Sequence, residues 1–95
     1  MRTRLVLPDY FTERDAELAR DRGYLSHVLV ALPDGTMHPV YFTDACRLQQ
    51  DLEDEVKRGK CFLAERGLII LTEVTLPNAA NAVESLFDQG YFTLQ

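Results

Sequence analysis

The stretch "LSHVLVALPDGTMHPVYF" (residues 25–42) decides the fold, because two β-prone runs flank the turn residues Pro33-Asp34-Gly35. Proline at the second turn position and glycine at the fourth favour a type I turn with a glycine bulge, which leaves a three-residue loop. The stretch therefore predicts an antiparallel hairpin. Because Pro39 has no amide donor, the second arm should lie at a sheet edge or carry a bulge.

Around this hairpin, three polar stretches each end at a glycine, and these glycines are Gly23, Gly59 and Gly90. A glycine just past a helix end accepts the left-handed conformation that a C-terminal cap requires. The pattern "DRGYL", "KRGKC" and "DQGYF" is therefore interpreted as three helix ends, not as a functional repeat. The predicted helices cover residues 11–22, 44–58 and 78–89.

Local signals support each helix. Thr12 can cap the first, with Asp15 three residues later, and Asn78 can cap the third behind Pro77. The middle and the last helix show apolar stripes at helical period. The stripe of the middle helix is Ala45, Leu48, Leu52 and Val56. The core face of the last helix is Ala79, Ala82, Val83, Leu86 and Phe87.

Further strands fill the remaining segments. "CFLAERGLIILTEVT" (61–75) predicts a second hairpin that turns at Arg66-Gly67, residues 91–95 a final strand, and residues 3–7 a first strand. We expect one α+β domain over residues 1–95, with a mainly antiparallel sheet of five or six strands and two or three helices on one face. The order (β)αββαββαβ is topologically related to the ferredoxin-like plait, which says little about function.

Composition excludes several classes of function. The net charge of −5 and the pI near 4.8 disfavour binding to nucleic acid and to anionic membranes. The N-terminal apolar run is far shorter than a signal-peptide core, and no run of apolar residues approaches the ~20 of a membrane span. With two cysteines and no CxxC spacing, we expect a cytoplasmic protein with reduced thiols.

No catalytic, cofactor or metal motif emerges from the residues. The favoured turn pairs Val30 with His38 and places His27 on the opposite sheet face, roughly 10 Å away along the strands. One zinc ion cannot bind both histidines at ~2.0–2.3 Å. Cys46 is expected to be a surface thiol at the start of the middle helix, and Cys61 a core residue of a strand.

The acidic run "DLEDEVKR" (51–58) is interpreted as a solvated, self-paired helix face. The spacing predicts pairs four residues apart, each contributing about 0.2–0.5 kcal/mol. These pairs are Arg47 with Asp51, Glu53 with Lys57, and Asp54 with Arg58. Asp44 and Glu55 are left without a local partner.

The second hairpin carries more apolar side chains than the helices can cover. Its predicted two-residue turn pairs Glu65 with Leu68 and Leu63 with Ile70, so that both faces are apolar. Three or four such side chains left in water forgo roughly 5–12 kcal/mol. These side chains could be covered by the N-terminal segment, by a second copy of the chain or by another protein. The candidate interaction residues are Phe62, Leu63, Leu68, Ile69, Ile70 and Leu71.

Three functions remain open at this point. The leading hypothesis is a small non-enzymatic protein–protein interaction or regulatory domain that forms a homodimer through its sheet. The alternative is an acidic inhibitor or immunity-type protein that blocks a basic partner. A small enzyme that uses Cys46 or His27 is the third.

Overall fold

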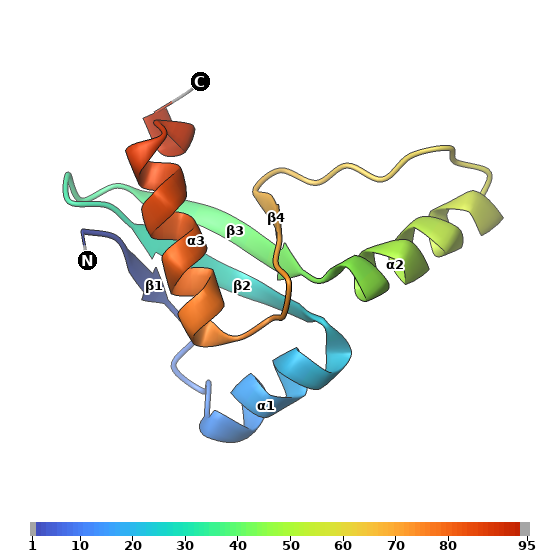
Figure 1. Ribbon diagram of the computed structural model, residues 1–95, viewed down its shortest axis with the longest axis horizontal. Helices are drawn as coiled ribbons and strands as arrows, with labels where there is room; N and C mark the ends of the chain where they lie inside the picture. The colour runs from blue at the N-terminus through green and yellow to red at the C-terminus, as the bar shows by residue number, and fades with distance from the viewer. Residues whose placement is uncertain (1, 94–95) are drawn as a thin grey trace.

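A four-stranded mixed sheet lies at the centre of the computed structural model, which describes residues 2–93 (Figure 1). Its strands are β1 (Arg4–Val6), β2 (Tyr24–Ala31), β3 (Met37–Thr43) and β4 (Leu68–Ile70). They lie side by side in chain order, with β1 and β3 antiparallel to β2 and β4 parallel to β3. The helices are α1 (Glu13–Arg22), α2 (Ala45–Lys57) and α3 (Leu76–Asp88).

The predicted first hairpin is confirmed. Val30 pairs with His38, and the Leu32 amide donates to the Thr36 carbonyl (3.0 Å), which closes the three-residue loop. Gly35 has φ 87°, as a glycine bulge requires. The bulge that the hairpin carries lies in β2 between Leu25 and Val28, not beside Pro39.

Pro39 is compatible with the sheet although β3 is a central strand and proline has no amide donor. The amide of Tyr41 donates to the carbonyl of Gly67, the residue before β4 (2.9 Å). Amides two residues apart in a strand point toward the same neighbouring strand. The amide that Pro39 lacks would therefore point to the β4 side, at a position before the first residue of β4. The backbone there passes so close that a Cβ on Gly67 would lie 2.5 Å from the Pro39 carbonyl oxygen. Gly67, with φ 78°, therefore permits the close approach of two chain segments.

The helix termini confirm the local signals at α1 and shift the start of α3. Thr12 and Asp15 form a capping box, and Gly23 ends α1 in the left-handed conformation. The N-terminal cap of α3 is Thr75, not Asn78, because the Thr75 side chain accepts the Asn78 amide at 3.2 Å.

The core lies between one face of the sheet and the helices α1 and α3. Phe42 and Val30 from the sheet are fully buried, and Ala79 and Val83 of α3 pack against them, as the sequence predicted for that helix. Ala19 of α1 closes the same cluster. Figure 1 shows α3 crossing in front of the strands and α1 at the lower end of the sheet.

Helix α2 has a different position. It begins directly after β3 with Asp44 as its cap and runs away from the sheet (Figure 1), and none of its residues is buried. The apolar stripe therefore predicted the helix correctly but not a buried face, because no other element lies against it closely enough to exclude water.

The predicted second hairpin is wrong. Residues 58–67 form a loop without regular structure, and β4 pairs in parallel with β3 instead of with residues 61–65. Part of this apolar run is buried in the core instead, through Ile69, Leu71 and Val74. Cys61, predicted to be buried, is exposed in the loop.

The predicted final strand is also not formed within the described residues. Tyr91–Thr93 is a short 3-10 helix, and residues 94–95 lie outside the described part of the chain. The ring of Phe92 packs 5.3 Å from that of His38 and is buried, so this segment closes the end of the core.

The α+β class is thus confirmed, and its details are corrected. Within residues 2–93 the sheet has four strands, not five or six, and its sequential order differs from the ferredoxin-like arrangement. No helix of this part of the chain is long and apolar enough to cross a membrane.

Candidate interaction surface

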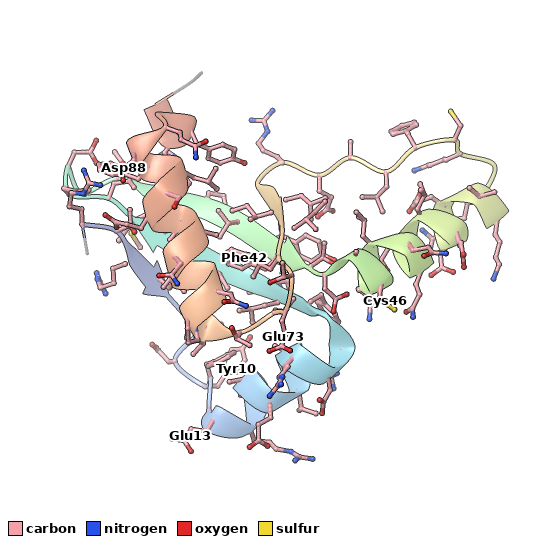
Figure 2. The ribbon with its side chains drawn as sticks, viewed as in Figure 1. Tyr10, Glu13, Phe42, Cys46, Glu73 and Asp88 are labelled. Carbon is pink, nitrogen blue, oxygen red and sulfur yellow. The ribbon has the colours of Figure 1, made fainter. Side chains whose placement is uncertain are left out.

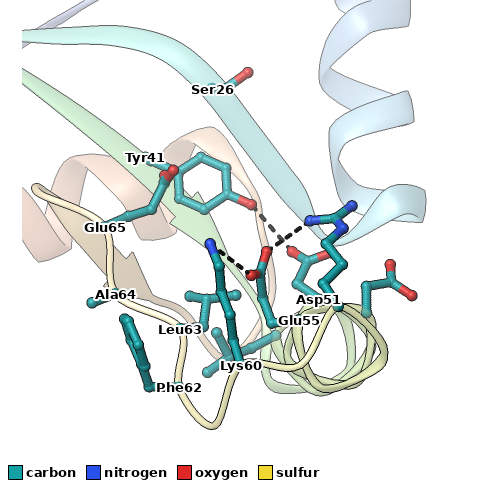
Figure 3. Close-up of a pocket in the computed structure, with 12 residues that line it drawn as sticks. Ser26, Tyr41, Asp51, Glu55, Lys60, Phe62, Leu63, Ala64 and Glu65 are labelled. Atoms are coloured by element: carbon teal, nitrogen blue, oxygen red, sulfur yellow. Dashed lines mark hydrogen bonds and ion pairs between the residues drawn. The ribbon is translucent and has the colours of Figure 1, made fainter.

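A groove of about 530 Å³ separates α2 from the returning loop 58–67 (Figure 3). Tyr41 of β3 lines its inner end, Leu48 of α2 and Leu63 of the loop contribute apolar side chains, and Phe62 lies at its rim. We call this cavity the α2 groove. Its walls come from segments that are distant in sequence, so the folded loop creates it.

A hydrogen-bonded group marks the inner end of the α2 groove. The Tyr41 hydroxyl donates to Asp51 Oδ2 at 3.4 Å, and Arg47 Nε donates to Asp51 Oδ1 at 3.1 Å. Partial burial, followed by the negative charge of Asp51, raises the pKa of Tyr41. The phenol therefore stays protonated at neutral pH and serves as a hydrogen-bond donor, not as a base. The guanidinium of Arg47 also stacks 4.3 Å above the ring of Tyr24.

The outer part of the α2 groove is held by Glu55. This carboxylate accepts from Arg58 Nη1 at 2.9 Å and pairs with Lys60 Nζ at 3.5 Å, as Figure 3 shows. Arg58 was predicted to pair with Asp54, and Glu55 was predicted to have no local partner. The loop explains the difference, because it turns back over α2 and brings Lys60 to Glu55. The predicted pair of Arg47 and Asp51 is confirmed.

The sheet face opposite the core forms the second feature of the surface. No helix of the described residues packs across it, since α1 and α3 pack on the core side and α2 runs away from the sheet. We call it the open face. The register and the alternation of side chains place on it residues that are half-buried or exposed. They are Arg4, Val6, Tyr24, Leu29, Ala31, Met37, Pro39, Tyr41, Leu68 and Ile70.

Large apolar side chains are also exposed beside the α2 groove. The exposed fractions of Leu52, Val56 and Phe62 are 39%, 59% and 59%. Leu52 and Val56 continue the stripe of α2 toward its free end, and Phe62 follows in the loop. These three side chains and the open face are therefore apolar surfaces that the fold leaves uncovered, and Tyr10 and Tyr91 are exposed elsewhere.

The six residues predicted as an interaction surface are divided between different environments. Ile69 and Leu71 are buried in the core, whereas Leu68 lies on the open face. Ile70, two residues after Leu68, lies on the same face at the edge of the sheet and is 55% exposed. The remaining two, Phe62 and Leu63, line the α2 groove. Whether these residues bind a partner remains a prediction.

Other residues of the surface were not among the predicted interaction residues. Leu29, Met37 and Tyr41 alternate with the core residues of the first hairpin. The same period of two in residues 25–42 could have identified them as the opposite face. The exposure of Val56 had no comparable signal in the sequence.

The residues considered for catalysis or metal binding do not form a cluster. His27 is exposed in the β2 bulge with φ 63°, and its Nδ1 lies 3.0 Å from the Ser26 hydroxyl. His38 packs against Phe92 at the end of the core. Cys46 is exposed on α2, as expected, and its Sγ lies 3.9 Å from Gln50 Nε2. Residues 2–93 contain no group of three or more histidine, cysteine or carboxylate side chains arranged to hold a metal ion.

The molecule is thus an α+β domain whose surface features are a groove and an uncovered sheet face. No family model, curated protein or solved structure shows significant similarity to this chain. Its function has to be inferred from the geometry of the domain itself.

Proposed function

We propose that the chain is a non-enzymatic protein–protein interaction domain that forms a homodimer through its sheet. The observation that carries the proposal is the open face, which has helices on its far side and none over it. Leu29 and Leu68 are half-buried there, and Met37 is 45% exposed. Sheets of which one face is solvated usually place polar residues on that face, so an apolar one favours a partner.

Full burial of one large apolar side chain contributes about 1.5–3 kcal/mol. Completing the burial of Leu29, Met37 and Leu68 would thus contribute a few kcal/mol from each copy. A second copy is the favoured partner because symmetric homodimers are the commonest oligomers of soluble proteins.

Sedimentation velocity of the full chain tests the proposal. Between about 1 and 200 µM, the mass should rise from one chain of 10.8 kDa toward two. A mass of one chain throughout this range would contradict self-association.

The α2 groove favours a second candidate function, an acidic domain that blocks a basic protein. Its lining holds four carboxylates and two cations, and the chain carries a net charge of −5. The carboxylates are those of Asp51, Asp54, Glu55 and Glu65, and the cations are Arg58 and Lys60. Capture of a basic protein by the immobilised chain should weaken steeply when salt is raised from 50 to 500 mM. The homodimer, held by apolar contacts, should persist over the same salt range.

A further inference from the structure

Helix α2 carries an apolar stripe that is only partly covered within the described residues. At 100° per residue, Ala45, Leu48, Leu52 and Val56 lie within about 80° of one another on one side of the helix. Leu48 is half-buried, but exposure rises along the stripe to 39% at Leu52 and 59% at Val56. Within one molecule, the stripe therefore contributes little to the core.

The open face of the same molecule cannot receive the whole of this stripe in the geometry that the chain adopts. Asp44 caps α2 one residue after β3 ends, and the helix then runs away from the strands (Figure 1). Figure 2 shows Cys46, in the first turn of α2, already beyond the end of the sheet. Helix α2 therefore reaches the open face of its own chain only near Tyr41, which donates to Asp51 and lines the α2 groove with Leu48. Leu52 and Val56 of the stripe and Met37 of the open face stay exposed.

We infer that two copies of the chain cover both surfaces at once, with the α2 stripe of each copy packed on the open face of the other. This inference rests on the proposed self-association and specifies its geometry. A twofold axis makes the two contacts equivalent, so each copy supplies one helix and one sheet face. Packing a helix on a sheet is the ordinary way in which α+β proteins bury such surfaces.

The area required by a stable dimer favours this reciprocal arrangement. A helix of 13 residues is about 20 Å long and about 10 Å wide, so one helix on one sheet covers far less than the ~1,200–2,000 Å² of standard interfaces. Two equivalent contacts double that area, and the range of standard interfaces is approached only when further segments join the contact. The reciprocal arrangement also brings the loops after both helices, with the 59% exposed Phe62, into the contact region.

The distribution of charge is compatible with the same arrangement. Beside its stripe, α2 carries four carboxylates within residues 51–55, of which Asp51 and Glu55 are already ion-paired within the molecule. Among the described strand residues, the charged side chain on the open face is that of Arg4, which is exposed. The acidic helix of one copy thus meets a face with a cation, whereas two α2 helices packed on each other would bring their carboxylates together.

Charge exchange between two variants tests the geometry. Leu52→Glu places a carboxylate in the stripe, and Leu29→Lys places an ammonium at the centre of the open face, between Val6 and Pro39. Each variant alone should dimerise at least tenfold more weakly than the native chain. An equimolar mixture should form a 1:1 dimer, because one contact is native and the other joins the new carboxylate to the new ammonium. Sedimentation velocity measures all three samples.

Matched controls place the same charges elsewhere. Gln50→Glu lies on the side of α2 opposite the stripe, and Ser85→Lys lies on the exposed side of α3. Both should dimerise like the native chain. Circular dichroism verifies the fold of every variant, and Met37→Lys, at a more exposed position of the open face, replaces Leu29→Lys if that variant does not fold.

The possible failures are distinguishable. A native chain that stays monomeric overturns the proposed function and this inference together. If Leu52→Glu still dimerises, the contact joins sheet to sheet, and if Leu29→Lys still dimerises, it joins helix to helix. Either result overturns the reciprocal arrangement but leaves self-association intact. The same conclusion follows if each variant alone fails to dimerise and their equimolar mixture also remains monomeric.

Discussion

At the scale of single residues, Glu84 joins the N-terminal strand to α3. Its Oε1 accepts from the Thr3 hydroxyl at 2.8 Å, from the Thr3 amide at 3.0 Å and from the Arg2 amide at 3.1 Å. Its Oε2 pairs with Arg2 Nε at 3.0 Å. The hydrogen bonds from Thr3, reinforced by Arg2, lower the pKa of Glu84 from 4.5 to about 2. One carboxylate therefore holds residues 2–3 against a helix more than 80 positions away.

Glu84→Gln should lower stability in a way that depends on pH. Because the folded pKa lies below the ordinary value, the native carboxylate stabilises the fold fully above pH 4.5 and loses this effect as the pH falls toward about 2. The midpoint of thermal unfolding should thus be lower in the variant at pH 7, and the two proteins should converge near pH 2. Glu17→Gln, at a side chain that is 71% exposed, is the control. A difference that persists unchanged at pH 2 would contradict this role.

At the scale of elements, α2 and α3 have the same length but different roles. Both span 13 residues and both have apolar stripes. Val83 of α3 is 1% exposed in the core, whereas Val56 of α2 is 59% exposed. Periodicity in the sequence predicted both helices, because it depends only on spacing along the chain. It could not distinguish a stripe that meets the sheet from one that does not.

A matched pair of substitutions measures this difference. Val83→Ala should lower the free energy of unfolding by about 2–3 kcal/mol, because it removes buried carbons and leaves a cavity. Val56→Ala should change it by less than about 0.5 kcal/mol. Denaturant unfolding at a protein concentration low enough to disfavour association compares the two. Equal losses would show that α2 is packed within a single folded chain.

At the scale of the whole molecule, self-association should make stability depend on concentration. A partner that binds only the folded chain shifts the equilibrium by mass action. When the protein concentration is raised about 100-fold, the thermal midpoint of the native chain should rise by several degrees. The midpoint of Leu29→Lys should stay constant over the same range. An unchanged midpoint in the native chain would argue against a dimer.

The sequence by itself determined the features that depend on neighbouring residues. Thr12 with Asp15 begins α1, Gly23 ends it, and the turn at residues 33–35 sets the pairing of Val30 with His38. Each of these signals acts over a few residues, where hydrogen bonds and backbone conformation decide the outcome. The candidate site was predicted less well, since of its six residues Ile69 and Leu71 are in the core.

Only the tertiary structure decided which distant segments meet. Gly67 passes against Pro39 and directs β4 into a parallel pair with β3, in place of the hairpin that the apolar run 61–71 suggested. The same placement sends residues 58–67 back over α2 and leaves the open face without a helix. These outcomes depend on competition between alternative long-range contacts, each with its own loop-closure entropy and buried area, and such a competition has no local signature in the sequence.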